Sequence, residues 1–212
     1  GDLVVAEYQT HGRGRLDRTF IAGRGEALLF SFYIRPQRPE SEWSFLPLLV
    51  GLSITQTLTR LITLEGETSR GEITTKWPND LLIADKKVSG TLMEYFDGGV
   101  IVGIGINTHM SQQSLPVDSA TSLWLALGVD FNRNELLAQI VLDFAQRLSA
   151  WEKGDSFLLE YESKSSTLGK SVKVELPNGE VLNGIASSIG SDGSLILDSG
   201  VRVSVGDVIH LR

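Results

Sequence analysis

The sequence predicts an α+β fold that is followed by a small barrel of short strands. Residues 3–106 are rich in strand-like apolar segments and contain one long helical pattern, which together are typical of α+β domains. Residues 172–211 contain five short apolar segments separated by turn sequences, and strands of this spacing favour a small barrel. We therefore expect two units, residues 1–166 and residues 167–212.

The elements of the first half follow from their apolar patterns. Residues 3–8 form an apolar strand, and residues 27–34 are a nearly continuous apolar run of strand length, which suggests burial on both faces. Residues 42–64 show the broad apolar stripe of a helix. Ser41 is a plausible N-cap for it, and Pro47 lies early, where a missing N–H costs least.

Further strands are expected at residues 72–77, 81–84, 87–96 and 100–106, and Asp-Gly-Gly at 97–99 supplies a hairpin turn. Residues 120–127 predict a short helix that ends at Gly128. Asn132 and Glu135 resemble a capping box that opens a helix to about residue 153. A last helix covers 157–166, with Gly169 beyond its end. The terminal strands are expected at 172–176, 181–187, 194–197, 201–204 and 208–211.

Composition excludes several classes of site. The chain has no cysteine, so disulfides, thiolate metal sites and a cysteine nucleophile are excluded. Its net charge of −7 argues against a fold-wide surface for nucleic acid. No signal peptide or membrane-length apolar run is visible, so we expect a cytoplasmic protein that does not bind membranes.

A basic, glycine-rich loop follows the first strand. Gly12, Arg13, Gly14 and Arg15 are joined by Arg18 within a few residues. Glycines allow close approach of a ligand to the backbone, and a guanidinium group can form bidentate hydrogen bonds to two phosphate or carboxylate oxygens. The loop is therefore a candidate anion site, with a solvated basic loop as the alternative.

The segment KWPND at residues 76–80 places polar side chains at the end of a strand. Asp80 could hold a magnesium ion, which prefers one or two carboxylates together with phosphates. The alternative is an ordinary turn, because Pro-Asn-Asp is common turn composition.

Two further motifs lie on the following strands. Lys87 precedes Gly90, where a ligand could lie against the backbone; the alternative is a hairpin with exposed lysines. Gly103 and Gly105 alternate along an apolar strand and leave one face without side chains, which makes room for a flat apolar ligand or relieves a crowded sheet crossing.

Taken in order, QTxGRGR, KWPND, KxxGxLxE and GxGxN closely resemble the biotin–protein ligase family, and the resemblance extends over residues 3–212. It implies a mixed sheet with helices on one side, related to class II aminoacyl-tRNA synthetases, and then an SH3-like barrel. It also implies a reaction in which biotin and ATP give biotinyl-5′-AMP, from which biotin passes to a lysine of a biotin carboxyl carrier domain.

The resemblance assigns roles by position. Lys87 is the first choice for the catalytic residue, assisted by Arg15, because attack of one anion on another needs positive charge at the meeting point. The biotin-binding residues it implies are Gln9, Gly12, Arg13, Arg15, Lys87, Gly90, Leu92, Gly103 and Gly105. The ATP-binding residues are Arg15, Arg18, Phe20, Asn79, Asp80, Lys87 and Asn107, with Asp80 as the candidate for Mg²⁺.

The sequence departs from the family pattern at three places. Asp17 stands where the family often has glycine, and Phe20 stands where a tryptophan commonly covers the adenine. The family's upstream Ser/Thr-Thr-Asn segment is not present in the sequence. These departures leave two alternatives open: a related lipoate–protein ligase, and a non-catalytic biotin- or nucleotide-binding module. A homodimer is compatible with the sequence, and a DNA-binding domain is not expected within it.

Overall fold

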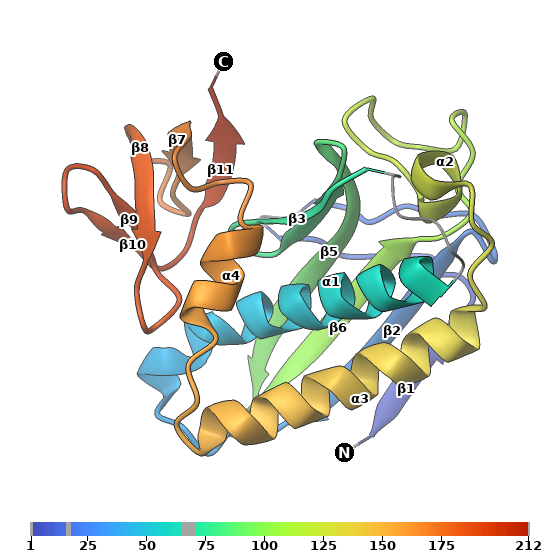
Figure 1. Ribbon diagram of the computed structural model, residues 1–212, viewed down its shortest axis with the longest axis horizontal. Coiled ribbons are helices and arrows are strands. Elements are labelled where there is room, and N and C mark those ends of the chain that lie inside the picture. Colours follow the sequence, from blue (N-terminus) through green and yellow to red (C-terminus); the bar gives the residue numbers. More distant parts are fainter. Residues whose placement is uncertain (1, 16–17, 65–70, 212) are drawn as a thin grey trace.

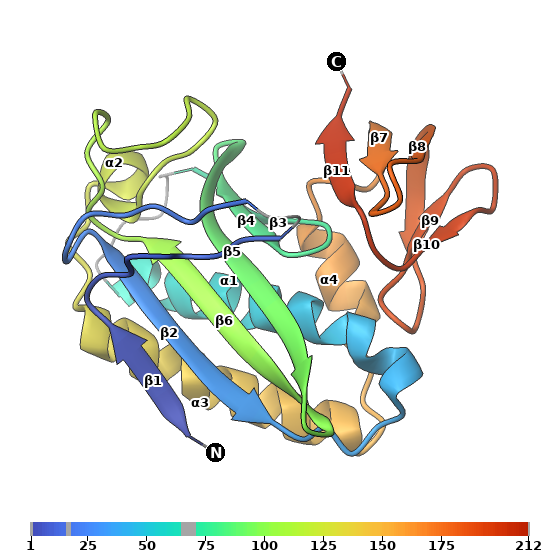
Figure 2. The ribbon, with the colours of Figure 1, turned by 180° about the vertical axis from the view of Figure 1, so that it is seen from behind.

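A computed structural model describes residues 2–15, 18–64 and 71–211 of the chain. Its first unit is built on a six-stranded sheet with the order β1-β2-β6-β5-β4-β3 (Figures 1 and 2). The strands are β1 (Leu3–Ala6), β2 (Ala27–Ile34), β3 (Ile73–Lys76), β4 (Asp80–Ile83), β5 (Lys86–Phe96) and β6 (Gly99–Asn107). The departure at Asp17 lies outside the described residues.

The pairing of this sheet is simpler than expected. Every pair of neighbouring strands is antiparallel, and parallel pairing within the described residues is confined to two isolated bridges, Thr75 with Ser165 and Lys87 with Ala120. The predicted mixed sheet is thus an antiparallel one. Asp97 and Gly98 both have positive φ at the β5–β6 turn, as a two-residue hairpin requires.

Helices cover one face of the sheet (Figure 2). The helices along this face include α1 (Leu46–Leu64) and α3 (Arg133–Glu152), and the first unit also contains α2 (Leu123–Leu127) and α4 (Leu158–Lys164). The apolar stripe of α1 is fully buried at Leu48, Leu49 and Leu52, and α3 adds Leu136 and Ile140 to the same core. Helices on one side of an antiparallel sheet confirm the predicted α+β class.

The predicted start of the first long helix was wrong. Residues Glu40–Phe45 form a 3₁₀ helix whose N-cap is Pro39 without a side-chain cap, so Ser41 is not the cap. This turn is held by burial of Trp43, whose indole Nε1 donates to the carbonyl of Arg38 at 2.7 Å. The α-helix begins only at Leu46, with Pro47 in its first turn, where its missing N–H is tolerated.

The later helices begin at polar caps. Ser122 caps α2, which starts at Leu123 rather than at residue 120 and ends at Gly128 in the left-handed conformation. The side chain of Asn132 accepts hydrogen bonds from the backbone N–H groups of residues 134 and 135, which confirms it as the cap of α3.

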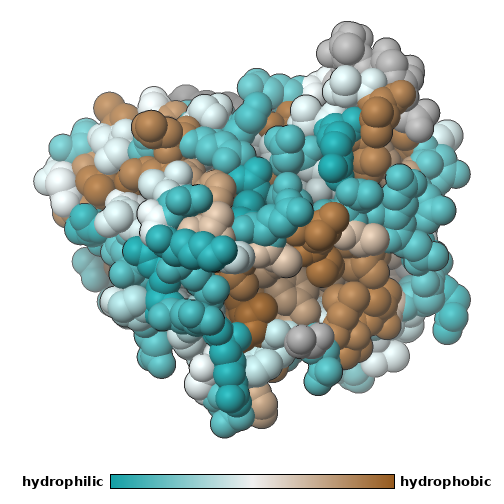
Figure 3. Space-filling view, turned by 60° about the horizontal axis from the view of Figure 1, so that its bottom comes forward, coloured by the Kyte–Doolittle hydropathy of each residue, from teal (hydrophilic) through white to brown (hydrophobic). Residues whose placement is uncertain are grey.

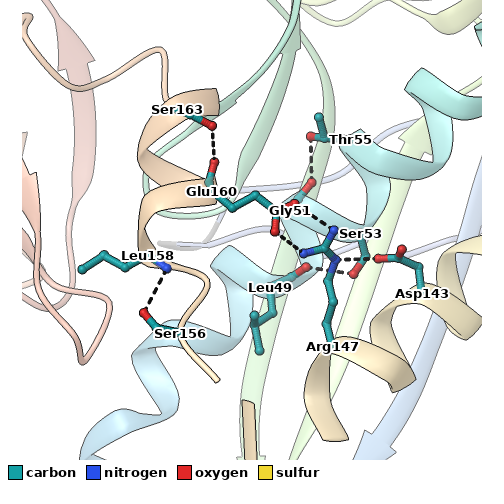
Figure 4. A network of polar contacts seen from close by, with 10 residues as sticks. All are labelled: Leu49, Gly51, Ser53, Thr55, Asp143, Arg147, Ser156, Leu158, Glu160 and Ser163. Atoms are coloured by element: carbon teal, nitrogen blue, oxygen red, sulfur yellow. Dashed lines mark hydrogen bonds and ion pairs between the residues drawn. The ribbon is translucent and has the colours of Figure 1, made fainter. Parts of the chain in front are cut away.

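An arginine ties α3 to α4. Arg147 donates to Asp143 at 2.7 Å and to both oxygens of Glu160 at 2.8 and 2.9 Å (Figure 4). Its guanidinium also lies 5.2 Å from the centre of the Phe157 ring. The side chain of Arg147 is only 11% exposed, whereas that of Glu160 is 40% exposed. These contacts fix α4 where the chain passes to the second unit.

The second unit is a five-stranded antiparallel sheet with the order β10-β9-β8-β7-β11, consistent with the predicted SH3-like fold. Its strands are β7 (Ser171–Glu175), β8 (Val181–Ile189), β9 (Leu195–Leu197), β10 (Arg202–Val203) and β11 (Asp207–His210). It joins the first unit through Trp77, whose Nε1 donates to the carbonyl of Gly193 at 2.9 Å. The division at residue 167 stays a prediction.

Hydrophobic residues also reach the surface. Figure 3 shows them gathered on the face that lies at the bottom of Figure 1, and the edge strand β1 exposes Leu3, Val4 and Val5.

Within the described residues, Glu40–Leu64 is long and apolar enough to cross a membrane, but 67% of that window is buried, as expected for the core helix of a folded domain. The homodimer with which the sequence is compatible stays a hypothesis.

Candidate functional site

A cavity of about 1170 Å³ opens on the sheet face opposite the helices, between the segments 9–15 and 18–21, strands β4 to β6 and strand β11. With a single exception, the residues singled out in the sequence as binding or catalytic line it. They are Gln9, Arg13, Arg15, Arg18, Phe20, Asn79, Asp80, Lys87, Gly90, Leu92, Gly103, Gly105 and Asn107.

The exception is Gly12, which is buried and does not line the cavity. A Cβ here would overlap the carbonyl oxygen of Phe20 and lie 3.0 Å from Oε1 of Gln9. The N–H of Phe20 donates to the carbonyl of Gly12 at 3.0 Å. Gly12 is therefore needed where the two arms of the loop meet, and the structure gives it no direct contact with a ligand in this cavity.

Gly103 and Gly105 lie on the cavity side of β6. A Cβ on Gly105 would lie 2.7 Å from the ring of Phe20, whereas a Cβ on Gly103 would meet Oγ of Ser31 at an ordinary 3.5 Å. The Phe20 ring thus occupies the space above Gly105 that a side chain would fill, and open floor remains at Gly103. This arrangement gives the cavity one apolar wall.

Lys87 reaches the cavity because of a β-bulge. Leu81 pairs with Ser89 and Leu82 pairs with Lys87, so Val88 is an extra residue in β5. A bulge bends its strand and redirects its side chains. Val88 is fully buried in the core while Lys87 lines the cavity. The backbone of Lys87 is held on both sides, by hydrogen bonds to Ser119 and Thr121 at 2.8 Å.

Asp80 holds the ammonium group of Lys87. The Nζ of Lys87 lies 2.5 Å from Oδ1 of Asp80, and these side chains are 42% and 16% exposed. A Cβ on Gly90 would lie 3.2 Å from this Nζ, so the missing side chain at Gly90 leaves room for the ammonium. Within the described residues no group of three or more His, Cys, Asp or Glu side chains could hold a metal ion.

The basic loop is folded back on itself and over the cavity. The N–H of Gly14 donates to the carbonyl of Arg18 at 2.6 Å, and residues 13 and 19 form a bridge. Arg13 pairs with Glu94 of β5 at 2.7 Å. These contacts set the direction in which the other two arginines point.

Arg15 and Arg18 reach across to the second unit. Arg15 donates to Oδ1 of Asn79 and to the carbonyl of Gly206, both at 3.0 Å, and Arg18 pairs with Asp207. Burial lowers the pKa of Arg15 below its usual value, whereas the hydrogen bond to Asp207 raises the pKa of Arg18. Both guanidinium groups stay charged, because neither is deprotonated at ordinary pH.

Two asparagines are fixed by backbone groups. The amide of Asn79 donates to the carbonyl of Thr91 at 2.7 Å, which leaves its oxygen for Arg15. The amide of the buried Asn107 donates to the carbonyl of Thr121 at 2.9 Å. Both side chains therefore keep one orientation at the rim of the cavity, as a binding site requires.

The cavity is also lined by Lys76, Lys170, Asp207 and His210, none of which was among the predicted site residues. Lys76 belongs to the KWPND motif, so its place in that motif was an available signal. The other three come from the second unit, and only the packing of the two units brings them to the cavity. Burial, followed by the charges of Lys76 and Lys170, lowers the pKa of His210 to about 4, so this imidazole is neutral at pH 7.

Comparison with known proteins identifies the family. Residues 1–111 match the biotin/lipoate A/B protein ligase family, and residues 167–211 match the biotin protein ligase C terminal domain. The biotin--[acetyl-CoA-carboxylase] ligase of Mycobacterium tuberculosis is 36% identical over 218 residues, which cover 100% of this chain and 80% of that protein. The bifunctional ligase/repressor BirA of Salmonella typhimurium is 28% identical over 100% of this chain and 67% of its own length.

A solved structure has the same architecture. Biotin protein ligase from Aquifex aeolicus, in complex with biotin and ATP, superposes with a TM-score of 0.83 at 30% identity, covering 99% of this chain and 88% of that one. The matched family model, the relative at 36% identity and this likeness agree, and the chain therefore belongs to the biotin/lipoate A/B protein ligase family.

Proposed function

We infer that this chain is a biotin–protein ligase that uses ATP. In the first step a carboxylate oxygen of biotin attacks the α-phosphorus of ATP, the bond from that phosphorus to the bridging oxygen breaks, and pyrophosphate leaves with the electron pair. In the second step a lysine amine attacks the biotinyl carbonyl, AMP leaves, and the amine loses a proton. The first step needs cations that bring two anions together.

The observation that carries this proposal is the placement of Lys87 beside Asp80, in the same cavity as Arg15. The bulge aims the Lys87 ammonium into the cavity, and Asn79 holds the Arg15 guanidinium over the same space. A carboxylate and a phosphate that meet there are stabilised by two positive charges already in position, so little reorganisation is needed in the transition state. No protein nucleophile takes part.

The rest of the cavity fits the two substrates. We propose that the apolar body of biotin lies on the open floor at Gly103 beside Leu92, with Gln9 as a hydrogen-bond partner of its ureido ring. The nucleotide would lie toward Phe20, Asn79 and Asn107. Magnesium would enter with ATP, held mainly by phosphate oxygens, and Asp80 is the carboxylate we propose to contact it, although that carboxylate already pairs with Lys87.

The acceptor that we propose is a lysine of a biotin carboxyl carrier domain, as the relative named biotin--[acetyl-CoA-carboxylase] ligase suggests. The cavity lining contains six Lys and Arg side chains against four Asp and Glu side chains, although the chain as a whole has a net charge of −7. This local positive field favours anionic substrates at the site. We further propose that the protein acts in the cytoplasm, where ATP is abundant.

Biotin-dependent exchange of labelled pyrophosphate into ATP tests the proposed function. The expected result is exchange with biotin and none with lipoate, in the presence of Mg²⁺. Exchange with lipoate alone would identify a lipoate–protein ligase instead. Biotin binding without exchange would identify a non-catalytic binding module and contradict the proposal.

A further inference from the structure

The strand pairing beside Lys87 changes partner. Pairing of β5 with β6 stops at Ser89, and next to Lys87 an irregular segment takes the place of β6. The N–H of Lys87 donates to the carbonyl of Ser119, and the N–H of Thr121 donates to the carbonyl of Lys87, both at 2.8 Å. Together they make an isolated parallel bridge between Lys87 and Ala120. The backbone that carries the proposed catalytic ammonium is therefore held by residues 119–121.

These three residues belong to a stretch with little regular structure of its own. Residues 108–119 form no helix or strand, and residues 116–119 are exposed. Inside the stretch, the N–H of Ala120 donates to the nearby carbonyl of Val117 at 3.1 Å. Exposed backbone without regular pairing opens more easily than a core strand, so the two bonds to Lys87 need a fixed point behind them.

Asn107 supplies that fixed point. It is the last residue of β6, where it pairs with Ala27 of β2, and it is only 7% exposed. Its side-chain amide donates to the carbonyl of Thr121 at 2.9 Å. Thr121 is thus held on one side by Lys87 and on the other by the sheet. The amide of Asn107 is the side-chain member of this chain of hydrogen bonds, whose other members are backbone groups.

We propose that Asn107 is a positioning residue for Lys87, acting through residues 119–121. The stem of a lysine is long and flexible, so the place of its ammonium depends on the backbone that carries it as well as on its partner Asp80. A charge that is preorganised for the transition state loses much of its effect when it is displaced by about 1 Å. The inference rests on the proposed function and deepens it, since it gives Asn107 a role in the chemical step that does not depend on contact with the nucleotide.

Replacing the amide tests this role. Asn107→Ala is expected to lower kcat of biotin-dependent pyrophosphate exchange about tenfold, and to change KM for ATP by a smaller factor. Asn107→Leu keeps most of the side-chain volume without the amide, so the same loss of kcat is expected even if the alanine variant does not fold. A kcat within twofold of wild type, or a larger effect on KM for ATP than on kcat, would overturn the proposal.

A double variant tests whether the effect passes through Lys87. In a Lys87→Met background the ammonium is absent and its placement no longer matters. Adding Asn107→Leu is therefore expected to lower the residual kcat less than about twofold. A further tenfold loss in this background would show that Asn107 acts independently of Lys87, and would overturn the proposal.

Ser122→Ala is the matched control. The Oγ of the buried Ser122 also donates to a backbone carbonyl, that of Met110 at 2.8 Å, and Ser122 follows Thr121 in the chain, but this bond does not lead to Lys87. The control is expected to lower Tm as Asn107→Leu does and to keep kcat within twofold of wild type. Equal losses of kcat in both variants would indicate general loosening of the segment and contradict the positioning role.

Amide hydrogen exchange measured by NMR tests the placement without any activity. Asn107→Leu is expected to speed exchange at the N–H groups of Lys87 and Thr121 about tenfold. The N–H of Thr91, which lies on β5 and donates to the carbonyl of Asn79 at 3.0 Å, is expected to exchange as in wild type. Unchanged exchange at Lys87 and Thr121 would refute the proposal. If the wild-type chain catalyses no pyrophosphate exchange, the proposed function fails, while this measurement still decides whether Asn107 holds Lys87 in place.

Discussion

Replacing Lys87 with methionine removes the ammonium from the cavity and keeps most of the side-chain stem. The structure separates two consequences. Asp80 loses an ion pair whose lysine is 42% exposed, and a pair so accessible to water contributes about 1 kcal/mol. For a chain of this size that corresponds to a fall in Tm of about 2–4 °C.

The expected effect on catalysis is much larger. Removing a preorganised donor that is aimed at developing charge lowers kcat by about 10²–10³-fold. Biotin-dependent pyrophosphate exchange at 25 °C, far below the melting transition, therefore measures the catalytic loss without a contribution from unfolding. Lys86→Met is the matched control, because Lys86 is the exposed neighbour on the same strand and does not line the cavity.

Exchange in Lys87→Met within about threefold of wild type would refute the reasoning, since the roles of Asp80, Gly90 and the bulge all depend on this ammonium. A fall in Tm well beyond a few degrees would contradict the small contribution to stability that is assigned to the ion pair of Lys87 with Asp80. An equal loss in Lys86→Met would show that general positive charge matters rather than the position of Lys87.

Four further outcomes are expected. Arg15→Lys keeps the charge but loses the two-pronged contact, and should raise the dissociation rate of the adenylate about tenfold. Gly103→Ala projects a methyl group into the cavity, where it meets Oγ of Ser31 and the carbonyl oxygen of Leu92 only at ordinary contact distances, and should raise the biotin dissociation constant about tenfold at unchanged Tm. Trp77→Phe leaves a barrel carbonyl unpaired and should cost about 1–3 kcal/mol of stability. Arg147→Met should cost about 1–2 kcal/mol, since its partners are partly exposed, with exchange at 25 °C unchanged.

Stopped-flow measurement of adenylate release checks the Arg15→Lys outcome, and calorimetric titration of biotin checks the Gly103→Ala outcome. Thermal melts check the two stability outcomes. Wild-type adenylate release in Arg15→Lys would contradict the contact geometry of the loop, and a fall in Tm for Gly103→Ala would show that its Cβ position is not open. For Trp77 the control is Trp124→Phe, because Trp124 is 48% exposed. For Arg147 it is Arg35→Met, whose ion pair with Asp97 is exposed on both sides. If Trp77→Phe and Trp124→Phe lowered Tm equally, the role given to the Trp77 hydrogen bond would be refuted. Equal shifts in Arg147→Met and Arg35→Met would refute the role given to Arg147.

The sequence predicted most of the fold because its local signals agree with the packing. The run at Ala27–Ile34 became β2 with the same bounds, and Asn132 capped α3 as expected. The start of α1 could not be predicted, because the 3₁₀ turn before it is stabilised by tertiary contacts, the burial of Trp43 and Phe45, rather than by a polar cap. Local propensity carries no information on such contacts.

The candidate site was predictable where motifs mark it and not elsewhere. Lys87 and Arg15 lie in recognisable segments, and both line the cavity. Gly12 lies in the same motif, yet its missing side chain relieves crowding inside the loop. Asp207 and His210 lie on a short terminal strand with no motif of their own, and they reach the cavity only because β11 packs beside it.

Direct detection of biotinyl-5′-AMP tests the central claim most directly. The chain would be mixed with biotin and Mg-ATP without acceptor, quenched with acid, and analysed by mass spectrometry beside a parallel reaction with lipoate. The account predicts one biotinyl-5′-AMP and one pyrophosphate per active chain, with no adenylate from lipoate, and loss of the biotinyl-5′-AMP when a carrier domain is added. A chain that binds biotin and ATP but yields no biotinyl-5′-AMP would contradict it.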